Sequence, residues 1–418
     1  MSPLGAARAL SLSLAALCLT ACGSPRAASP TEIFDRVADL TAQEFFDPDL
    51  NGIDWTAARA RHALALEAEA TDSELSAAIN GLLAELDTSH THYYHADEAA
   101  FHFLVDLFGL AGDFPALYPD GQVNYVGAGW FVERIGGQAF VSGVLGGGPA
   151  EEAGVLTGDL ILDMNGVPWT DLSVFEERAG QPLTLRVQRG AATTDVVTLE
   201  LVPRRLQPLQ LFAEAVSHSF VIEERLGLSF AVARMWSYAG EELHELLVEA
   251  VTTGPLMDAG ALVLDLRGGW GGASPAFLDL FNTSIPALTM TPRDGDAAVL
   301  DDRWRRPVVL LTDEGTRSGK ELLAHGFKRH GLGQVVGKTT AGAVVGGRPF
   351  AVSPRGLLYL AVVDVTVDGL RLEGVGVEPD VVVDRQLPFS AGRDPQLERA
   401  LEVALETLLL SLRRCPGP

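Results

Sequence analysis

Cysteine is scarce in this sequence: the 418 residues contain three, at positions 18, 22 and 415. Basic residues are also in the minority, with 31 lysines and arginines against 55 aspartates and glutamates and a formal charge of −24. No basic patch stands out that could release counterions from phosphates, so we expect no nucleic-acid partner. Hydrophobic residues make up 47% of the chain, which predicts a globular protein with enough core for two or three domains.

The first 22 residues are expected to be an export signal and not part of the fold. Arg8 gives a weakly basic start, and residues 9–17 form an apolar run too short to span a bilayer comfortably. The run leads into Leu-Thr-Ala-Cys, which resembles a bacterial lipoprotein signal and implies that Cys22 is diacylated. The lipid would tether the chain to a membrane of the bacterial cell envelope, with residues 23–30 as a linker. An ordinary secretory signal cut nearby is the alternative.

Processing of such a signal leaves few cysteines for chemistry. Cys18 would be lost with the signal and Cys22 would be acylated, so Cys415 would stand alone. One mature chain could then build neither a disulfide framework nor a cysteine-based metal site. Cys415 lies in a Pro-Gly-Pro tail with nothing to position it as a nucleophile.

Residues 31–115 are predicted to form a helical N-terminal domain. Apolar residues recur at helical spacing behind two candidate N-caps, Thr31 and Asp72. Near the end of this domain lie four of the nine histidines: His90, His92, His95 and His102. Their spacings match no strong zinc signature, so we expect no metal and no cofactor. We favour one functional histidine among solvated neighbours.

Residues 120–205 carry a different pattern, of short strands separated by glycine-containing turns. The run PAEEAGVLTGDLILDMNG at residues 149–166 resembles the helix, turn and strand of PDZ domains. Such domains add an extended peptide to a sheet edge and hold its C-terminal carboxylate in the N–H groups of a glycine-rich loop. By position, the resemblance assigns that loop to Val126, Gly127, Ala128 and Gly129.

Strands and helices alternate over residues 206–395, which predicts an α/β domain with its loops beyond the strand ends. A buried strand over residues 261–267 opens into the glycine-rich segment 268–272, and another strand begins at Val308. A strand over residues 357–366 is expected to help close this domain. Residues 396–418 are expected to form a C-terminal helix and tail.

Ser318 falls where the turn after the Val308 strand becomes a helix. A helix N-terminus presents free N–H groups and the positive end of the helix dipole, which can stabilise an oxyanion beside a hydroxyl. The position therefore suits a nucleophile. Serine is also among the commonest N-cap residues, so this stretch alone leaves a capping role open.

The order of motifs along the chain resembles that of the C-terminal processing (tail-specific) peptidases. Leu-x-x-Ser-His-Thr, the PDZ-like module, Asp-Leu-Arg-x-x-x-Gly-Gly, a serine opening a helix and Gly-Val-x-Pro-Asp follow one another. The resemblance implies a multidomain α/β protein whose peptidase core is crotonase-like (ββα). It does not extend to the family's Ser-Lys design, because an alanine within residues 340–344 stands where the lysine would be.

The motifs instead resemble the tricorn-like branch, in which a Ser-His pair and a glutamate complete a tetrad with the nucleophile. The resemblance implies that Ser318 is the nucleophile and His90 the base, with Ser89 orienting His90 and Glu373 anchoring Ser89. A serine hydroxyl needs a neighbouring base, and imidazole suits that task near neutral pH. Glu378 competes with Glu373 for the fourth role.

Two backbone N–H groups should face the developing oxyanion, and we expect those of Gly319 and Gly271. The sequence thus predicts an envelope-anchored serine endopeptidase that hydrolyses exported polypeptides, with substrate C-termini presented by the PDZ domain. The alternative is a non-catalytic lipoprotein that binds peptides or apolar ligands, because a scaffold does not guarantee chemistry. An α/β-hydrolase esterase is set aside, since Thr316 and Lys320 occupy the glycine positions of Gly-x-Ser-x-Gly.

Overall fold

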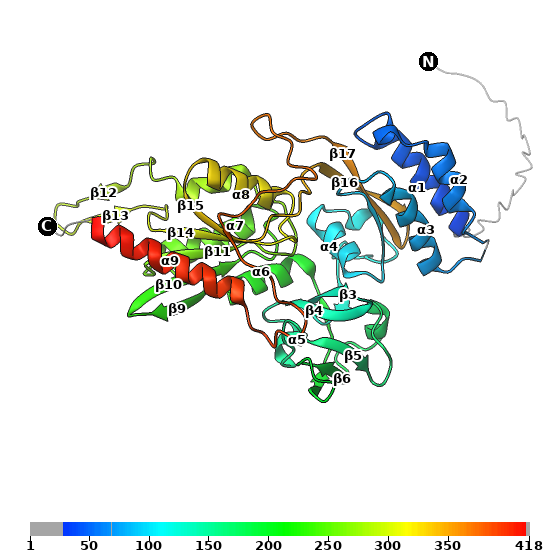
Figure 1. Cartoon of the computed structure of the whole chain (residues 1–418), viewed down its shortest axis with the longest axis horizontal. Coiled ribbons are helices and arrows are strands. Elements are labelled where there is room, and N and C mark those ends of the chain that lie inside the picture. Colours follow the sequence, from blue (N-terminus) through cyan, green and yellow to red (C-terminus); the bar gives the residue numbers. More distant parts are fainter. Residues whose placement is uncertain (1–27, 68, 415–418) are drawn as a thin grey trace, which may run out of the picture.

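The computed structural model describes residues 28–67 and 69–414 and has three regions (Figure 1). Helices near the N-terminus lie at one end, an α/β core lies at the other, and a small β-rich unit packs beside both. The predicted signal over residues 1–22, with Cys22, and the C-terminal Cys415 lie outside the described residues. Within those residues, no helix combines the length and the apolar character needed to cross a membrane.

The N-terminal region is mostly helical, as its periodicity predicts. Capping boxes fix the start of two helices, with Ser29 and Glu32 at the first and Thr71 and Glu74 at the third. The predicted N-caps Thr31 and Asp72 were therefore wrong by one or two residues, because both lie inside their helices. The helices are α1 (Pro30–Glu44), η1 (Leu50–Gly52), α2 (Trp55–Ala63), α3 (Asp72–Ala84), α4 (Ala99–Leu107) and η2 (Ala111–Asp113).

A three-stranded sheet completes this region, and the structure here corrects two expectations. Strand β1 (His92–His95) pairs antiparallel with β17 (Gly356–Val363), which pairs with β16 (Gly346–Ser353). The strand expected to close the α/β core therefore belongs to the N-terminal region, which is neither purely helical nor built from one stretch of chain. Phe34 and Ile79 from the helices share one buried core with Leu358 and Leu360 from β17, and burying that shared face holds the distant segments together.

The β-rich unit is a five-stranded antiparallel sheet in the order β3-β4-β5-β6-β7, with its own buried core around Val141, Phe175 and Val187. The helix and strand expected within residues 149–166 are present as α5 (Pro149–Glu152) and β5. A separate pair joins β2 (Tyr125–Gly127) to β8 (Arg204–Leu206), and η3 (Leu172–Phe175) precedes β6. The strands are β3 (Trp130–Ile135), β4 (Gln138–Val144), β5 (Leu160–Met164), β6 (Leu183–Gln188) and β7 (Val196–Leu201).

The α/β core is a six-stranded sheet in the order β18-β15-β14-β11-β10-β9, parallel except at the β9–β10 edge. Side chains alternate between its faces: Leu262 and Leu264 pack towards α7 and α8, whereas Ala261 and Val263 pack towards α9. The strands are β9 (Val221–Arg225), β10 (Leu228–Arg234), β11 (Ala261–Asp265), β14 (Val308–Thr312), β15 (Gly333–Gly337) and β18 (Val381–Val382). The helices are α6 (Pro208–His218), α7 (Glu241–Thr252), η4 (Pro275–Phe281), α8 (Gly319–Arg329) and α9 (Pro395–Arg414).

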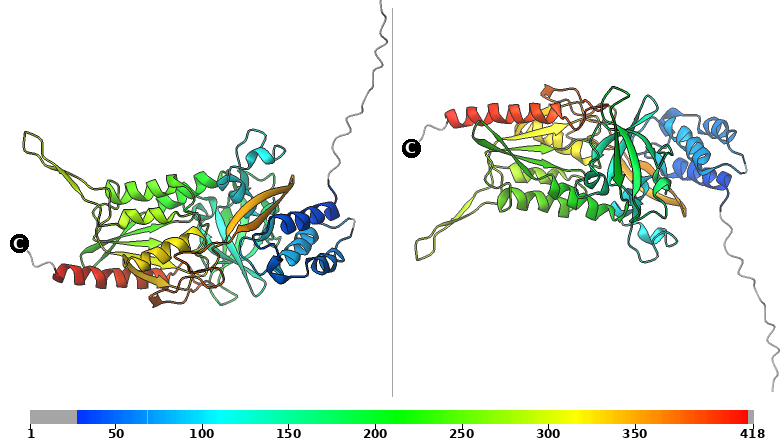
Figure 2. Two further views of the ribbon diagram at one scale, coloured as in Figure 1. Left: turned by 90° about the horizontal axis from the view of Figure 1, so that it is seen from above. Right: turned by 90° about the horizontal axis from the view of Figure 1, so that it is seen from below.

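The sheet topology decides where the glycine loop, residues 268–272, meets Ser318. Strands β11 and β14 are parallel neighbours with Val263 opposite Val309, so their carboxyl ends lie at the same edge. The glycine loop follows β11, and the turn to Ser318 follows β14. At another side of the core, the hairpin of β12 (Leu288–Met290) and β13 (Ala298–Leu300) projects away from the body (Figure 2).

Candidate active site

Ser318 is the N-cap residue of α8. Its backbone φ is +57°, in the left-handed region that non-glycine residues seldom adopt because of the steric cost. The Ser318 N–H donates to the Ala343 carbonyl at 2.9 Å and also lies 3.1 Å from Oε2 of Glu321. The strained residue is therefore held between its own helix and a second loop.

Glu321 organises that second loop, and the sequence analysis missed it. Its carboxylate accepts from the Thr340 hydroxyl at 2.5 Å and from the N–H groups of Gly342 and Ala343 at 2.7 and 2.8 Å. The side chain is completely buried, and burial raises the pKa of Glu321. The Ser-x-x-Glu spacing from Ser318 to Glu321, a capping-box pattern, is the sequence signal that could have found it.

Ser89 and His90 immediately precede β1 and reach the site because β1 pairs with β17. The Ser89 Oγ lies 2.9 Å from Nδ1 of His90 and donates to Oε2 of Glu373 at 3.0 Å. The Ser89 N–H also donates to Oε1 of Glu373 at 2.8 Å. Ser89 thus bridges the imidazole of His90 and the carboxylate of Glu373, a residue 284 positions later in the sequence.

These contacts define the tautomer of His90. The Ser89 hydroxyl has one proton, which it donates to the Glu373 carboxylate. The contact between Ser89 Oγ and His90 Nδ1 therefore needs the proton of Nδ1–H. The lone pair of the neutral ring then sits on Nε2, the nitrogen that a general base uses.

The carboxylate of Glu373 has further donors. Its Oε2 accepts from the N–H groups of Val344 and Val345 at 2.7 and 3.1 Å. Burial alone would raise the pKa of Glu373, but the hydrogen bonds from Ser89, Val344 and Val345 outweigh it and lower the pKa. Glu378, by contrast, is exposed. Of the two glutamates, the structure brings Glu373 to the Ser-His pair.

The imidazole of His90 is half-buried in the cleft wall, and its ring lies 5.3 Å from that of Tyr359. Burial, followed by the positive charge of Arg317, lowers the pKa of His90 to about 4, while Glu373 opposes the shift. A histidine with this pKa is neutral at pH 7 and is able to accept a proton.

Gly271 lies directly against Ser318. A methyl group on its Cα would stand 2.6 Å from Ser318 Cβ and 3.3 Å from Ser318 Oγ, so another residue would not fit there. Gly319 is the first residue of α8, and a methyl group on it would meet the Ala273 carbonyl oxygen at 2.3 Å. The two glycines nominated for the oxyanion hole thus flank Ser318, where only glycine allows so close an approach.

Buried charged groups hold the glycine loop. The Gly268 N–H donates to Oδ1 of Asp313 at 2.9 Å, and the Gly268 carbonyl accepts from Nζ of Lys320 at 2.9 Å. Burial, together with the charge of Arg234, lowers the pKa of the completely buried Lys320 to about 7. The sequence analysis did not assign a role to Lys320 or Asp313, since charged residues give no local sign of burial.

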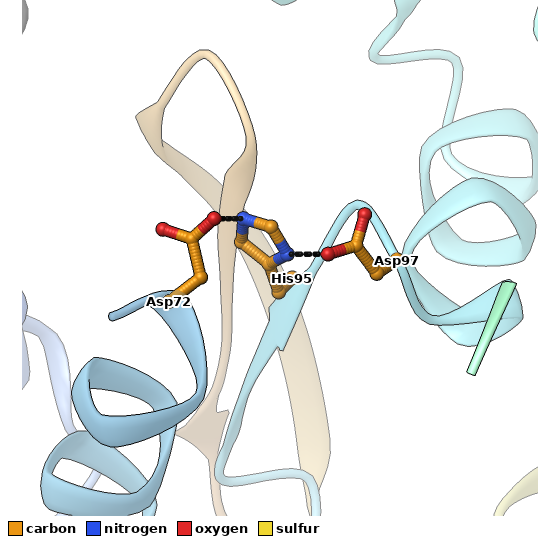
Figure 3. Close-up of side chains that lie close together, drawn as sticks. All are labelled: Asp72, His95 and Asp97. Atoms are coloured by element: carbon orange, nitrogen blue, oxygen red, sulfur yellow. Dashed lines mark ion pairs between the residues drawn. The ribbon is translucent and has the colours of Figure 1, made fainter. Parts of the chain in front are cut away.

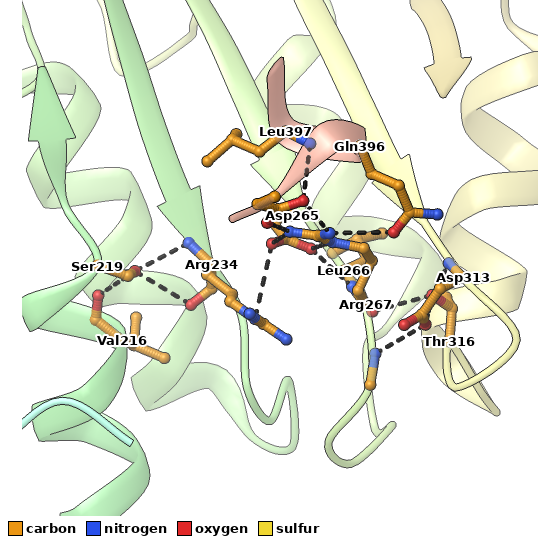
Figure 4. Close-up of polar contacts among 12 residues, drawn as sticks. Val216, Ser219, Arg234, Asp265, Leu266, Arg267, Asp313, Thr316, Gln396 and Leu397 are labelled. Atoms are coloured by element: carbon orange, nitrogen blue, oxygen red, sulfur yellow. Dashed lines mark hydrogen bonds and ion pairs between the residues drawn. The ribbon is translucent and has the colours of Figure 1, made fainter. Parts of the chain in front are cut away.

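An ion network lies beside this loop (Figure 4). Arg267 pairs with Asp265 at 2.7 Å and with Asp394 at 2.6 Å, and it donates to Gln396 at 3.0 Å. The network joins the end of β11 to the start of α9. It anchors one end of the glycine loop to the C-terminal helix.

The histidines near His90 do not converge on one point. His102 is a core residue between the Tyr118 hydroxyl and the Ala96 carbonyl, at 2.5 and 2.8 Å. His95 lies between two carboxylates, with Nε2 at 3.2 Å from Asp72 and Nδ1 at 3.0 Å from Asp97.

Figure 3 shows the two carboxylates on opposite sides of the His95 ring. Asp72, His95 and Asp97 lie close enough together to be considered as metal ligands. The two carboxylates, however, contact different nitrogens of the ring, and a single ion can bind only one of them. Arg355 also pairs with Asp97. The arrangement fits a chain of ion pairs better than a metal site.

A cleft of about 460 Å³ contains Ser318, His90, Ser89 and Gly271 in its wall. The wall combines the N-terminal region with the α/β core. Aromatic and apolar side chains supply much of the rest: Tyr94, Leu104, Leu107, Phe108, Trp270 and Tyr359.

The predicted PDZ loop is part strand and part turn. Val126 and Gly127 belong to β2, while Ala128 and Gly129 form the turn into β3. Ala128 and Gly129 line a second cavity, of about 290 Å³, together with the N-terminal part of α4. Asp97, Glu98 and Asp171 also line it, and burial raises the pKa of Glu98.

Two family models match this chain. The model described as Peptidase family S41 matches residues 221–383, a segment that includes the glycine loop, Ser318 and Glu373. The model described as Tricorn protease C1 domain matches residues 26–84, which cover the first helices. The cleft-lining residues of the α/β core and of β16 and β17 lie within the first match, whereas those between Thr88 and Phe108 lie outside both matches.

Known proteins match over most of the chain. Tricorn protease homolog 1 of Streptomyces coelicolor is 26% identical over 404 residues, which cover 91% of this chain and 36% of the homolog. The carboxyl-terminal-processing protease of Synechocystis sp. is 26% identical over 307 residues, which cover 68% of this chain and 69% of that protein. The chain spans about a third of the length of the tricorn homologs it matches.

Among solved structures, the crystal structure of the tricorn protease is similar with a TM-score of 0.55 at 19% identity, over 91% of this chain and 37% of that one. At such identity the likeness shows a shared fold. The family match adds to this likeness, because it covers the segments that contain Ser318 and Glu373. Residues 221–383 thus match peptidase family S41, and C-terminal processing proteases and tricorn homologs are among the proteins to which the chain is similar.

Proposed function

We propose that this protein is a serine peptidase that hydrolyses peptide bonds with a tetrad of Ser318, His90, Ser89 and Glu373. The observation that carries the proposal is the Ser89 hydroxyl, which joins His90 to the Glu373 carboxylate in the wall of the cleft that also holds Ser318. A structural serine or histidine has no need of this arrangement, whereas a general base must have its tautomer fixed.

In the proposed reaction, Ser318 Oγ attacks the carbonyl carbon of the scissile bond while Nε2 of His90 takes the hydroxyl proton. The Ser89 hydroxyl and the Glu373 carboxylate stabilise the imidazolium that forms. The N–H groups of Gly271 and Gly319 receive the oxyanion of the tetrahedral intermediate. The intermediate collapses as His90 returns the proton to the leaving amine, and water then hydrolyses the acyl ester on Ser318 by the same steps.

The test is labelling by a fluorophosphonate probe, combined with hydrolysis of an unfolded polypeptide. We expect Ser318→Ala to abolish both and His90→Ala to reduce both by about a thousandfold or more. Ser284→Ala, on an exposed turn, is the matched control and should behave as wild type. Equal labelling of wild type and Ser318→Ala would contradict the proposal. An unlabelled wild type that still binds peptides would favour the non-catalytic lipoprotein.

We also propose that lipid on Cys22 anchors the protein to the bacterial cell envelope. The support is the signal-like sequence ending in Leu-Thr-Ala-Cys. The test is incorporation of a labelled fatty acid in cells that produce wild type or Cys22→Ala. We expect label and membrane association in the wild type, and neither in the variant.

A further proposal is that residues 126–129 receive the C-terminus of a substrate polypeptide. The support is the PDZ-like run at residues 149–166 and the cavity beside Ala128 and Gly129. Carboxylates in the cavity wall repel a terminal carboxylate, so we expect peptide binding to tighten as the pH falls and Glu98 becomes protonated. Fluorescence anisotropy with free-acid and amidated peptides tests this, and equal binding of the two would contradict it.

A further inference from the structure

One permanently charged side chain lines the active-site cleft: Arg317, the residue before the nucleophile. Among the described residues that line the cleft there is no aspartate or glutamate. The two histidines in the wall that carry a lowered pKa of about 4, His90 and His92, are neutral at pH 7. Glu373 lies behind Ser89 and does not line the cleft. An empty cleft is therefore cationic beside Ser318.

Among the described residues, none provides a counter-ion to the guanidinium of Arg317. Over the described parts of the chain it takes part in no hydrogen bond and no ion pair, and the Trp270 ring, 5.7 Å away, supports it from one side. Arg267 shows the contrast, since it is saturated by Asp265, Asp394 and Gln396. In a chain with 55 acidic residues, an unpaired arginine next to the nucleophile leaves its donors available to a ligand.

We propose that Arg317 selects substrates that carry a carboxylate close to the scissile bond, and this inference rests on the proposed peptidase function. The planar guanidinium fork matches a carboxylate with two parallel hydrogen bonds. Since Arg317 precedes Ser318 directly, its reach corresponds to about one or two residues of an extended substrate. A substrate lysine at the same place would meet a like charge and be rejected.

A polypeptide can supply this carboxylate in two ways: from an aspartate or glutamate side chain, or from its own free C-terminus. Both present the same anion to Arg317, so the cleft chemistry is the same. They differ in consequence, because the first gives an endopeptidase with acidic preference and the second gives removal of C-terminal residues. Substrates that separate the two are therefore part of the test.

The first step is to digest an unfolded protein with the full-length enzyme and to identify the cleavage sites by mass spectrometry. Fluorogenic peptides are then built around the most frequent site, with Glu, Gln or Lys next to the scissile bond and with a free or amidated C-terminus. For wild type we expect kcat/KM to be about tenfold to a hundredfold higher for the carboxylate-bearing peptide than for its neutral partner.

Three variants separate the role of charge from that of folding. We expect Arg317→Gln to bring the ratio of acidic to neutral substrates close to one, Arg317→Lys to restore part of it, and Arg317→Glu to favour the Lys peptide. Arg329→Gln is the matched control, because Arg329 ends α8, the helix that follows Arg317, but pairs with Asp368 outside the cleft. It should leave the ratio as in wild type.

The outcomes distinguish this inference from the function on which it rests. Preference for the Glu peptide when its C-terminus is amidated identifies the side-chain source, and preference for the free acid with neutral side chains identifies the terminal source. Cleavage with no carboxylate preference, or a preference that survives Arg317→Gln, overturns the role of Arg317 while the peptidase stands. A wild type that neither cleaves nor takes the fluorophosphonate probe overturns both.

Discussion

The two walls of the cleft are held in different ways. On the core side, Ser318 and the glycine loop are fixed by completely buried charged groups, Glu321 and Lys320, each bonded to the backbone around Ser318. On the N-terminal side, Ser89 and His90 are attached through β1, and the contact that links the pair to the opposite wall is the half-buried Glu373.

Because of this difference, we expect variants of the core side to lose stability and variants of the N-terminal side to lose the alignment of the catalytic groups. Removing a buried group on the core side leaves polar backbone atoms unpaired, so the fold should suffer together with activity. In Glu373→Gln the amide oxygen still accepts from the N–H groups of Val344 and Val345, and the Ser89 N–H alone loses its acceptor, so the change affects mainly where the Ser89–His90 pair stands. Activity and stability measured on the same variants therefore test whether the walls differ as described.

The largest effect is expected from Glu373→Gln. An amide retains the shape but loses the charge that stabilises the imidazolium, so we expect kcat to fall by about a hundredfold or more with little change in Tm. Glu378→Gln is the matched control, since Glu378 is exposed and should be neutral in both measurements. A larger loss of kcat in Glu378→Gln than in Glu373→Gln would show that Glu378 is the acid of the tetrad.

Lys320→Met is expected to destabilise the core side. The variant leaves the Gly268 carbonyl without its donor, which costs about 1–3 kcal/mol of unfolding free energy, and it loosens the glycine loop. Lys338→Met, at a partly exposed lysine paired with the exposed Asp384, is the control. Denaturant unfolding with parallel activity assays measures both effects, and a lower kcat with unchanged stability would contradict the contrast between the walls.

The same lysine predicts how stability depends on pH. The pKa of Lys320 is lowered to about 7 in the folded protein, whereas the unfolded side chain titrates near 10.5. Between these values the unfolded chain holds a proton that the folded chain lacks, so this residue makes the unfolding free energy rise with pH over that window. Lys320→Met should flatten the rise, and an equal slope in wild type and variant would show that Lys320 stays charged.

A smaller effect is expected on the pH profile of catalysis. The base must be neutral, so kcat/KM should rise with pH through the pKa of His90, which burial and Arg317 lower to about 4. Removing the positive charge in Arg317→Gln favours the imidazolium and should move this acid limb to higher pH. Measured on a neutral peptide, the shift is independent of substrate charge. An acid limb at the same pH in wild type and variant would show that the charge of Arg317 does not act on the pKa of His90.

Local pattern was enough to predict much of the core side from the sequence. Strands β11 and β14 and the helix after Ser318 lie where apolar runs bounded by turns predict them. Parallel pairing then brings the glycine loop to Ser318 by topology alone. The burial of Lys320 and Glu321 was not predictable in this way, because a charged residue early in a helix looks like a solvated one until its neighbours are known.

The N-terminal side was less predictable, for a physical reason. Pairing between β1 and β17 joins segments with His92 opposite Tyr359, and nothing in a four-residue strand announces so distant a partner. The family resemblance pointed to Ser89, His90 and Glu373 although the sheet that unites them was not foreseen. The role of Arg317 was also missed, because an unpaired charge becomes visible only when the surroundings are known.

The smallest effect is expected at the exposed Asp72, which pairs with the buried His95 on the N-terminal side. Asp72, with 64% of its side chain exposed, pairs with Nε2 of His95 at 3.2 Å, and such exposed pairs contribute about 0–1 kcal/mol. Asp72→Asn should therefore lower the unfolding free energy by about 1 kcal/mol or less. Asp97→Asn should cost more, because Asp97 is less exposed and also pairs with Arg355. Zn²⁺ that raised the Tm of wild type but not of His95→Gln would replace the ion-pair interpretation with a metal site, so the titration should accompany the unfolding measurement.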